Sequence, residues 1–337
     1  MYCMILDSCL YNSLEPIITL HHFVHPAWLG LYPWLSSETT SLFLNYVKNV
    51  VIDINNYLNS KGRAPLRYFI TINEPNMLVM NTYLTSQFPS SNRGGINTSI
   101  QALNNLLITH IKTYNLIHDI YLAHDWGNVY ITTNNYTSDI YWLDKLIFDL
   151  LHIRERQIHI TEHYDNLICK YDEFQRFLLC SCKSILSPYQ QMFGLIANRF
   201  LKHFIQKQLT KESFIPVLTC LYQSTRESVL DLIAIDYYDP FTVNFFKIPH
   251  FVDLSFKYGN IINSVKYSFF SKWWDWRVLP EGLSLFCELY TKDYGSKPLL
   301  IAENGMAHRI HKDNHIIHRR DGILRSQFLK LHISEVL

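Results

Sequence analysis

Five short apolar runs, separated by long stretches with helical periodicity, constrain the fold of this 337-residue chain more than any other feature. Runs of this length bounded by polar residues are typical of buried strands, and strands that alternate with helices form parallel sheets. Acidic and polar residues collect at the ends of the runs, and the sequence has no glycine-rich phosphate loop. An α/β protein with a (β/α) barrel is therefore favoured over an open doubly wound sheet. The runs are residues 16–22, 66–72, 128–134, 231–238 and 298–302.

Apolar residues that recur with the 3.6-residue period predict the helices between the runs. The clearest stripe extends from Leu42 to Leu58. Ser36 or Ser37 can cap this helix, and Lys61-Gly62 ends it. Residues 142–229 are predicted to be mostly helical. Other helices are predicted at residues 1–14, 97–122 and 321–337, and one more begins near Pro280.

Two of the predicted strands deliver a glutamate at their carboxyl end. One leads into Glu74-Pro75, where Pro75 has no N–H for the ladder and predicts an extended backbone for Glu74. The other leads into Glu303-Asn304-Gly305. The carboxyl ends of barrel strands carry the active site, and two carboxylates are what the hydrolysis of a sugar acetal requires. Residues 77–96 are predicted as a loop at the same lip as Glu74.

The stretches Thr71–Pro75 and Ile301–Gly305 resemble the acid/base and nucleophile motifs of glycoside hydrolase family 1, the β-glucosidase family. Three more stretches are similar to the family in the same order, namely residues 16–23, 231–238 and 279–283. The resemblance covers almost the whole chain. It implies a (β/α)8 TIM barrel that is incomplete here, because the strands correspond to the third to seventh of the family. The first, second and eighth have no counterpart.

The resemblance also implies an activity, the retaining hydrolysis of a β-glycoside by a two-glutamate double displacement. Glu303 is expected to attack the anomeric carbon. Glu74 is expected to protonate the leaving oxygen and then to deprotonate the incoming water. Asn73 is expected to hydrogen-bond the sugar 2-hydroxyl. The mechanism needs no metal and no organic cofactor.

Further roles follow from the resemblance. His22 is expected to hydrogen-bond the sugar, Phe23 to form an aromatic wall, and Tyr238 to hydrogen-bond the nucleophile. Neighbouring strand residues point to opposite faces, so His21 and His22 cannot both face a barrel interior, and the alternative is that both are structural. Asp236 stands where the family usually has asparagine, and its extra negative charge could raise the pKa of a nearby carboxylate.

The remaining polar and aromatic clusters are interpreted mainly as structural. Asn134 and Asn135 could bind a polyol, but we favour a role in turning the loop. His159 and His163 could share a helix face, but they do not match a zinc motif. A third cluster, His308, His311, His315 and His318, is predicted to lie on a solvated face. A fourth, Trp273, Trp274 and Trp276, is predicted either to stack on sugars or to be buried.

Residues 1–337 are predicted to form one partial barrel domain. In the family the missing strands carry sugar-binding and nucleophile-orienting side chains, so two hypotheses stand. The first is a β-glucosidase-like hydrolase, a fragment of a longer reading frame or completed by another polypeptide. The second is a catalytically silent relative, either a binding or scaffold protein or a decayed gene product. The chain alone is expected to hydrolyse an aryl β-glucoside very slowly or not at all. Exposed strand edges could pair with another chain.

Composition limits the partners and the compartment. The 30 Lys and Arg residues balance 29 Asp and Glu residues without a basic block, so no nucleic-acid or membrane-surface partner is predicted beside the carbohydrate substrate. Seven cysteines without paired CxxC spacings favour buried free thiols in a reducing compartment. No signal peptide and no membrane-spanning run are recognised. A cytoplasmic protein is therefore predicted.

Overall fold

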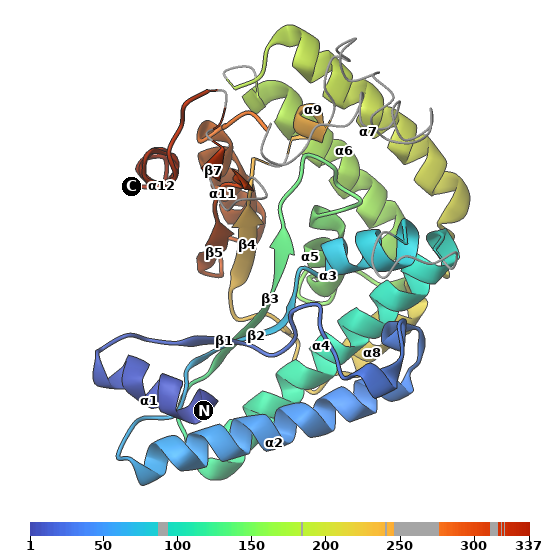
Figure 1. Cartoon of the computed structure of the whole chain (residues 1–337). Helices are drawn as coiled ribbons and strands as arrows, with labels where there is room; N and C mark the ends of the chain where they lie inside the picture. Colours follow the sequence, from blue (N-terminus) through green and yellow to red (C-terminus); the bar gives the residue numbers. More distant parts are fainter. Residues whose placement is uncertain are drawn as a thin grey trace. The chain divides into compact units, whose positions relative to one another are not determined.

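The described part of the chain contains all five predicted strands, in the order β1-β2-β3-β4-β5 within one sheet (Figure 1). The computed structural model describes residues 1–86, 94–182, 185–239, 241–245, 276–310, 316–317, 319 and 321–337. The strands are β1 Ile17–Thr19, β2 Tyr68–Asn73, β3 Tyr130–Tyr136, β4 Ile233–Tyr237 and β5 Leu299–Asn304. Helical segments separate successive strands, so the predicted α/β class is confirmed.

The strands pair in parallel, as crossover connections through helices require. Ile18 of β1 lies opposite Phe69 of β2, and Phe69 lies opposite Ile131 of β3. The chain leading into β4 joins β3 where the Asp231 N–H donates to the carbonyl oxygen of Ile131 at 2.9 Å. Further along, the Thr137 N–H donates to the carbonyl oxygen of Asp236 at 2.9 Å. Residue numbers rise together on both strands, so β4 is also parallel to β3.

The chain divides into two compact units. The first comprises Met1–Asn135, Leu146–Cys169 and Gln206–Ala234, and the second comprises Tyr136–Lys145, Lys170–Ile205 and Ile235–Leu337. The α-helices are α1 Tyr2–Tyr11, α2 Glu38–Ser60, α3 Pro75–Leu78, α4 Ile96–His124, α5 Lys145–Leu151, α6 His163–Ser181, α7 Pro188–Gln208, α8 Ile215–Gln223, α9 Thr242–Phe245, α11 Glu281–Tyr294 and α12 Arg325–Ser334. Among the described residues, no helix combines the length and apolarity needed to cross a bilayer.

In the first unit, helices α2 and α4 pack against each other and α4 contacts β2. The predicted stripe of α2 is buried at Phe43, Val47, Val51 and Leu58. A polar network then fixes the start of β2. The side chain of Asn55 donates to the Tyr121 hydroxyl at 2.9 Å and accepts from the Leu66 N–H at 3.0 Å. This network ties two helices to β2, the strand that leads into Glu74.

A second buried network holds the middle of β2. Nδ1 of His110 lies 2.7 Å from the hydroxyl of Thr71, and Nε2 lies 2.9 Å from the carbonyl oxygen of Val229. A carbonyl only accepts, so Nε2 carries the proton and Nδ1 accepts from Thr71. Burial lowers the pKa of His110 to about 4, which is consistent with this neutral ring.

In the second unit, β4 packs against α11. The buried Tyr237 hydroxyl donates to the carbonyl oxygen of Leu279 at 2.5 Å, just before α11 begins. Lys145 is also buried, and its Nζ lies 2.5 Å from Oδ2 of Asp293 and 3.2 Å from the Tyr294 hydroxyl. The buried ammonium is thus paired with a carboxylate, without which its burial would be costly.

Three local predictions were wrong or incomplete. Within residues 77–96, predicted as a loop, the end of α3 and a π-helix at Val79–Leu84 are present. Two short antiparallel strands, β6 Arg309–Ile310 and β7 Ile316–Ile317, lie in the predicted histidine-rich loop. The last helix is shorter than predicted, because it begins only at Arg325. His311, His315 and His318 are outside the described residues.

Candidate active site

Glu74 directly follows β2 and has a backbone conformation that the sequence did not predict. Its φ of 40° and ψ of 61° are left-handed, so the expected extended conformation was wrong. The Glu74 N–H donates to the carbonyl oxygen of Asn134 at 3.0 Å, and the Glu74 carbonyl oxygen accepts from the Leu78 N–H at 3.0 Å. Pro75 occupies the first position of α3, which suits its fixed φ. The strand therefore turns directly into a helix, and these bonds offset a backbone cost of about 1–3 kcal/mol.

Asn73, the last residue of β2, is buried beside a second amide. Its Oδ1 accepts from Nδ2 of Asn134 at 2.9 Å, and its Nδ2 lies 3.5 Å from Nε2 of His22. The Asn73 N–H donates to the carbonyl oxygen of His21 at 2.8 Å, which extends the contact between β1 and β2. In the first unit, Asn73 therefore contacts both His22 and Asn134, and Glu74 is the next residue along the chain.

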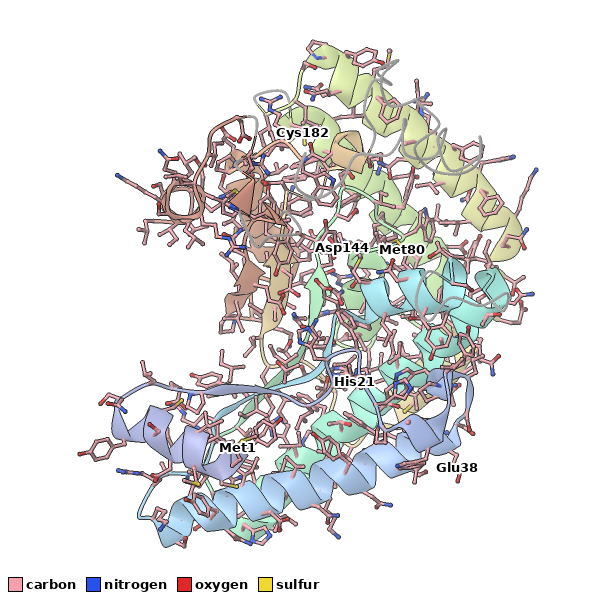
Figure 2. All side chains as sticks on the ribbon, viewed as in Figure 1. Met1, His21, Glu38, Met80, Asp144 and Cys182 are labelled. Carbon is pink, nitrogen blue, oxygen red and sulfur yellow. The ribbon has the colours of Figure 1, made fainter. Side chains whose placement is uncertain are left out.

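His21 is buried and His22 is exposed, but both lie just after β1 (Ile17–Thr19), whereas the prediction placed them inside a strand that reaches residue 22. The His21 ring (labelled in Figure 2) is buried and meets the Trp34 ring edge-on, with centroids 5.2 Å apart. Burial, with smaller contributions from His25 and His22, lowers the pKa of His21 to about 4. His22 is exposed, and its ring lies edge-on to Phe23, with centroids 5.0 Å apart. His21 is thus a core residue, and His22 is the histidine left for a ligand.

Glu303 lies at the end of β5, in the second unit. The hydroxyl of Tyr238 donates to Oε2 of Glu303 at 2.7 Å, which is the hydrogen bond that the resemblance implied. The Tyr238 ring is stacked on Tyr136, with centroids 6.2 Å apart and planes 12° apart. Nδ2 of Asn304 donates to the carbonyl oxygen of Tyr237 at 2.9 Å and fixes the end of β5 to β4.

Asp236 adds a second carboxylate to this unit. It is fully buried in β4, and a carboxylate oxygen of Asp236 lies within 4.8 Å of one of Glu303. The carboxyl group that stands in place of the asparagine implied by the resemblance is therefore next to Glu303.

Two of the other predicted clusters, the pair His159 and His163 and the tryptophans at residues 273–276, are described in part by the structure. His159 precedes the short 3₁₀ helix η4 Ile160–Glu162, and Nδ1 of His163 lies 2.6 Å from the carbonyl oxygen of Ile160, so the two histidines do not share a helix face. Trp276 is buried, which fits the core alternative. Trp273 and Trp274 lie outside the described residues.

Sequence reasoning missed the contact that Asn134 makes with Asn73. It interpreted Asn134 as a turn residue, although the position at the carboxyl end of a strand next to β2 was a usable signal. It also had no means of detecting the stacking of Tyr136 on Tyr238, because this depends on the register of β3 and β4.

Comparison with known proteins supports the predicted fold. The family described as Glycosyl hydrolase family 1 matches residues 1–337. A 6-phospho-beta-galactosidase from Lacticaseibacillus casei is 27% identical over 194 residues, which are 57% of this chain and 38% of that protein. One from Clostridium acetobutylicum is 21% identical over 352 aligned residues, covering 100% of this chain and 66% of that protein.

Among solved structures, the beta-glucosidase from Thermotoga maritima in complex with castanospermine matches with a TM-score of 0.58 and 17% identity. The match covers 99% of this chain and 63% of that structure, so the chain spans less than two thirds of it. The likeness confirms the predicted fold class, an α/β protein with part of a (β/α)8 barrel.

Proposed function

This chain belongs to glycosyl hydrolase family 1, and on that premise we propose that it carries the catalytic residues of a retaining β-glycosidase. The observation that carries the proposal is the hydrogen bond from Tyr238 to Glu303 at the end of β5. Glu303 is the nucleophile. With Oε2 held by the phenol, Oε1 attacks the anomeric carbon, the bond to the leaving oxygen breaks, and a glycosyl ester forms on Glu303.

Glu74 is the general acid and then the general base. It gives its proton to the departing oxygen, and afterwards it takes a proton from the water that cleaves the glycosyl ester. Retaining hydrolysis requires about 5–5.5 Å between the two carboxyl groups. The left-handed turn at Glu74 supports this role, because sparsely populated backbone conformations cluster at active sites.

The first unit supplies the sugar contacts. Nδ2 of Asn73 and Nε2 of His22 lie 3.5 Å apart, close enough for one hydroxyl group to reach both. Because Oδ1 of Asn73 accepts from the Asn134 amide, the orientation of the Asn73 side chain is fixed. Its Nδ2 group is then left to donate to the sugar 2-hydroxyl. Phe23, beside His22, provides an aromatic wall. These steps need no metal and no organic cofactor.

Covalent trapping tests the proposal even where turnover is slow. The chain is incubated with activated 2-deoxy-2-fluoro glycosides of glucose, galactose and 6-phosphogalactose, and the intact mass and peptide masses are measured. We chose these sugars from the names of the matching proteins. We expect one glycosyl group on Glu303 and none in Glu303→Gln. A folded chain that leaves Glu303 unlabelled by all three probes contradicts the proposal.

A catalytically silent relative is the second candidate function, and one observation favours it. The buried Asp236 carboxylate lies within 4.8 Å of Glu303, and two negative charges this close oppose each other. Asp236 stands where the resemblance implies asparagine, so the chain departs from the expected catalytic arrangement at a residue next to Glu303. Labelling that appears only in Asp236→Asn would identify the natural chain as silent.

We also propose that another polypeptide pairs with a sheet edge. Within the described sheet, β1 and β5 lie at the two ends of the strand order, and the six residues of β5 are half-buried. Sedimentation over a range of concentrations tests this. Association should weaken in Ile17→Lys, which puts a charge on the β1 edge, but not in the control Leu122→Lys. A chain that stays monomeric at every concentration contradicts self-pairing.

The free cysteines support our proposal of a reducing, cytoplasmic compartment.

A further inference from the structure

Helix α7 turns its apolar side outward. Five large apolar side chains, three or four positions apart, lie on one face of the helix and are exposed to solvent. They are Tyr189 (68% exposed), Met192 (53%), Ile196 (59%), Phe200 (70%) and Phe204 (47%). We call these five side chains the outer face of α7. Figure 1 labels the helix that carries them. Large contiguous apolar patches of this kind mark interaction sites on soluble proteins.

The opposite side of α7 is attached to its unit by polar contacts. Asn198 is buried, and its Nδ2 donates to the carbonyl oxygen of Asp139 at 3.0 Å. Its carbonyl oxygen accepts from the Tyr171 hydroxyl at 3.3 Å. Nε2 of Gln191 donates to the carbonyl oxygen of Leu186 at 2.8 Å. These contacts fix the rotation of the helix, so the outer face cannot turn inward without breaking them.

The charged side chains of helix α7 itself are all basic, and one of them, Lys202, pairs with Asp172 of α6 at 2.8 Å. Helix α7 contains no aspartate and no glutamate. Arg199, His203 and Lys207 are exposed and alternate with Phe200 and Phe204 along the helix. An exposed face that combines aromatic and aliphatic side chains with basic ones is typical of helices that lie in the interface of a membrane.

Composition alone predicted no membrane-surface partner, but from the exposed side chains of this helix we propose that the outer face of α7 binds the surface of an anionic lipid membrane. A second copy of the chain fits less well, because two outer faces brought together would place the basic side chains of one against those of the other. Anionic headgroups complement these charges, and the acyl boundary accepts the apolar side chains. The helix lies on the membrane, since no helix of the described residues can cross one.

Vesicle sedimentation with the full chain tests the proposal. Binding to phosphatidylcholine vesicles is compared with binding to vesicles that also contain phosphatidylglycerol, at low and high salt. We expect binding to the anionic vesicles to be about tenfold tighter and to weaken with salt. The variant Phe200→Gln/Phe204→Gln should lose about tenfold or more in partitioning. Leu122→Gln, at a residue that is 79% exposed on α4, is the matched control and should bind like the natural chain.

A second variant separates charge from apolar contact. Arg199→Gln/Lys207→Gln should lose about tenfold on anionic vesicles and little on neutral ones. Because all four substituted residues are exposed, circular dichroism and the melting temperature should not change. Absence of binding to anionic vesicles overturns the proposal, and so does an equal loss in Leu122→Gln. Variants that abolish self-association without affecting lipid binding also overturn it, and they would identify a protein interface.

Discussion

The hydroxyl oxygen of Tyr238 lies 2.7 Å from Oε2 of Glu303, and its ring is stacked on Tyr136. The phenol is therefore fixed from two directions, by a hydrogen bond and by a ring contact. It holds one carboxylate oxygen in place.

Tyr238→Phe should slow the labelling of Glu303 without unfolding the chain. The ring contacts stay, and only the donor to Oε2 is lost, so we expect about a tenfold to hundredfold slower rate of adduct formation. The rate is measured by intact mass against time. Tyr189→Phe, an exposed tyrosine on α7, is the control. Equal labelling rates in Tyr238→Phe and the natural chain would remove Tyr238 from the mechanism.

Asn134→Ala should reduce catalysis through Asn73. Without the bond from Asn134 Nδ2, the Asn73 amide can turn over and present its oxygen to the 2-hydroxyl. We expect about a tenfold loss in single-turnover release from an aryl β-glycoside, but little loss with the 2-deoxy analogue, which lacks that hydroxyl. Asn45→Ala, at an exposed position of α2, is the control. An equal loss on both substrates would show that Asn134 acts only through stability.

Asp236→Asn should stabilise the chain at neutral pH and speed the labelling of Glu303. A carboxylate oxygen of Asp236 lies within 4.8 Å of one of Glu303, and two unit charges at that distance repel each other by about 3 kcal/mol at an effective dielectric constant of 20. The amide of asparagine carries no charge and removes this repulsion. Urea denaturation at neutral pH measures the effect. An Asp236→Asn variant that is less stable at neutral pH would contradict this prediction.

Gly282→Ala should destabilise the second unit by about 1–3 kcal/mol. A Cβ at Gly282 would overlap the buried Tyr237 hydroxyl and would lie 2.6 Å from Cε2 of Phe241. Gly194→Ala is the matched control, because a Cβ there meets only Oδ2 of Asp139, at 3.8 Å. In that helix interior alanine should be neutral or stabilising by up to about 1 kcal/mol. Thermal melts of both variants check the contrast, which an unchanged Gly282→Ala melt would refute.

Asp139 should make stability depend on pH between about 4 and 6. Burial raises its pKa from 3.8 to about 6, although the Thr242 N–H and hydroxyl donate to Oδ1 at 2.8 and 2.6 Å. The folded state therefore holds this proton more tightly than the unfolded state. The contribution of protonated Asp139 to the free energy of unfolding is fully present below pH 3.8 and is lost as the pH rises through 6. This contribution is about 3 kcal/mol at most.

Comparing Asp139→Asn with the natural chain isolates this effect from other titrating groups. The amide keeps an acceptor for Thr242 and cannot ionise. Near pH 4 the variant and the natural chain should have about the same free energy of unfolding. Above pH 6 the variant should be the more stable of the two. Urea denaturation at several pH values gives this difference. A difference that does not vary with pH would refute the raised pKa.

The amino-acid sequence by itself determined the five strands, their order and the two glutamates at strand ends. These features follow from local information, namely apolar period, strand length, and proline or glycine after the last residue. Even so, one local rule failed at Glu74. The preference of a residue before proline for extended backbone was outweighed by backbone bonds to Asn134 and Leu78, and only one of these partners is near in sequence.

Only the tertiary structure decided which side chains meet. The bond between Asn134 and Asn73 joins residues 61 positions apart and depends on the register between β2 and β3, since a shift of one residue would turn either side chain to the other face. The same holds for Asp236 beside Glu303. The outward rotation of α7 is a third case. Its 3.6-residue pattern defines an apolar face, but packing around Asn198 determines that this face points to solvent.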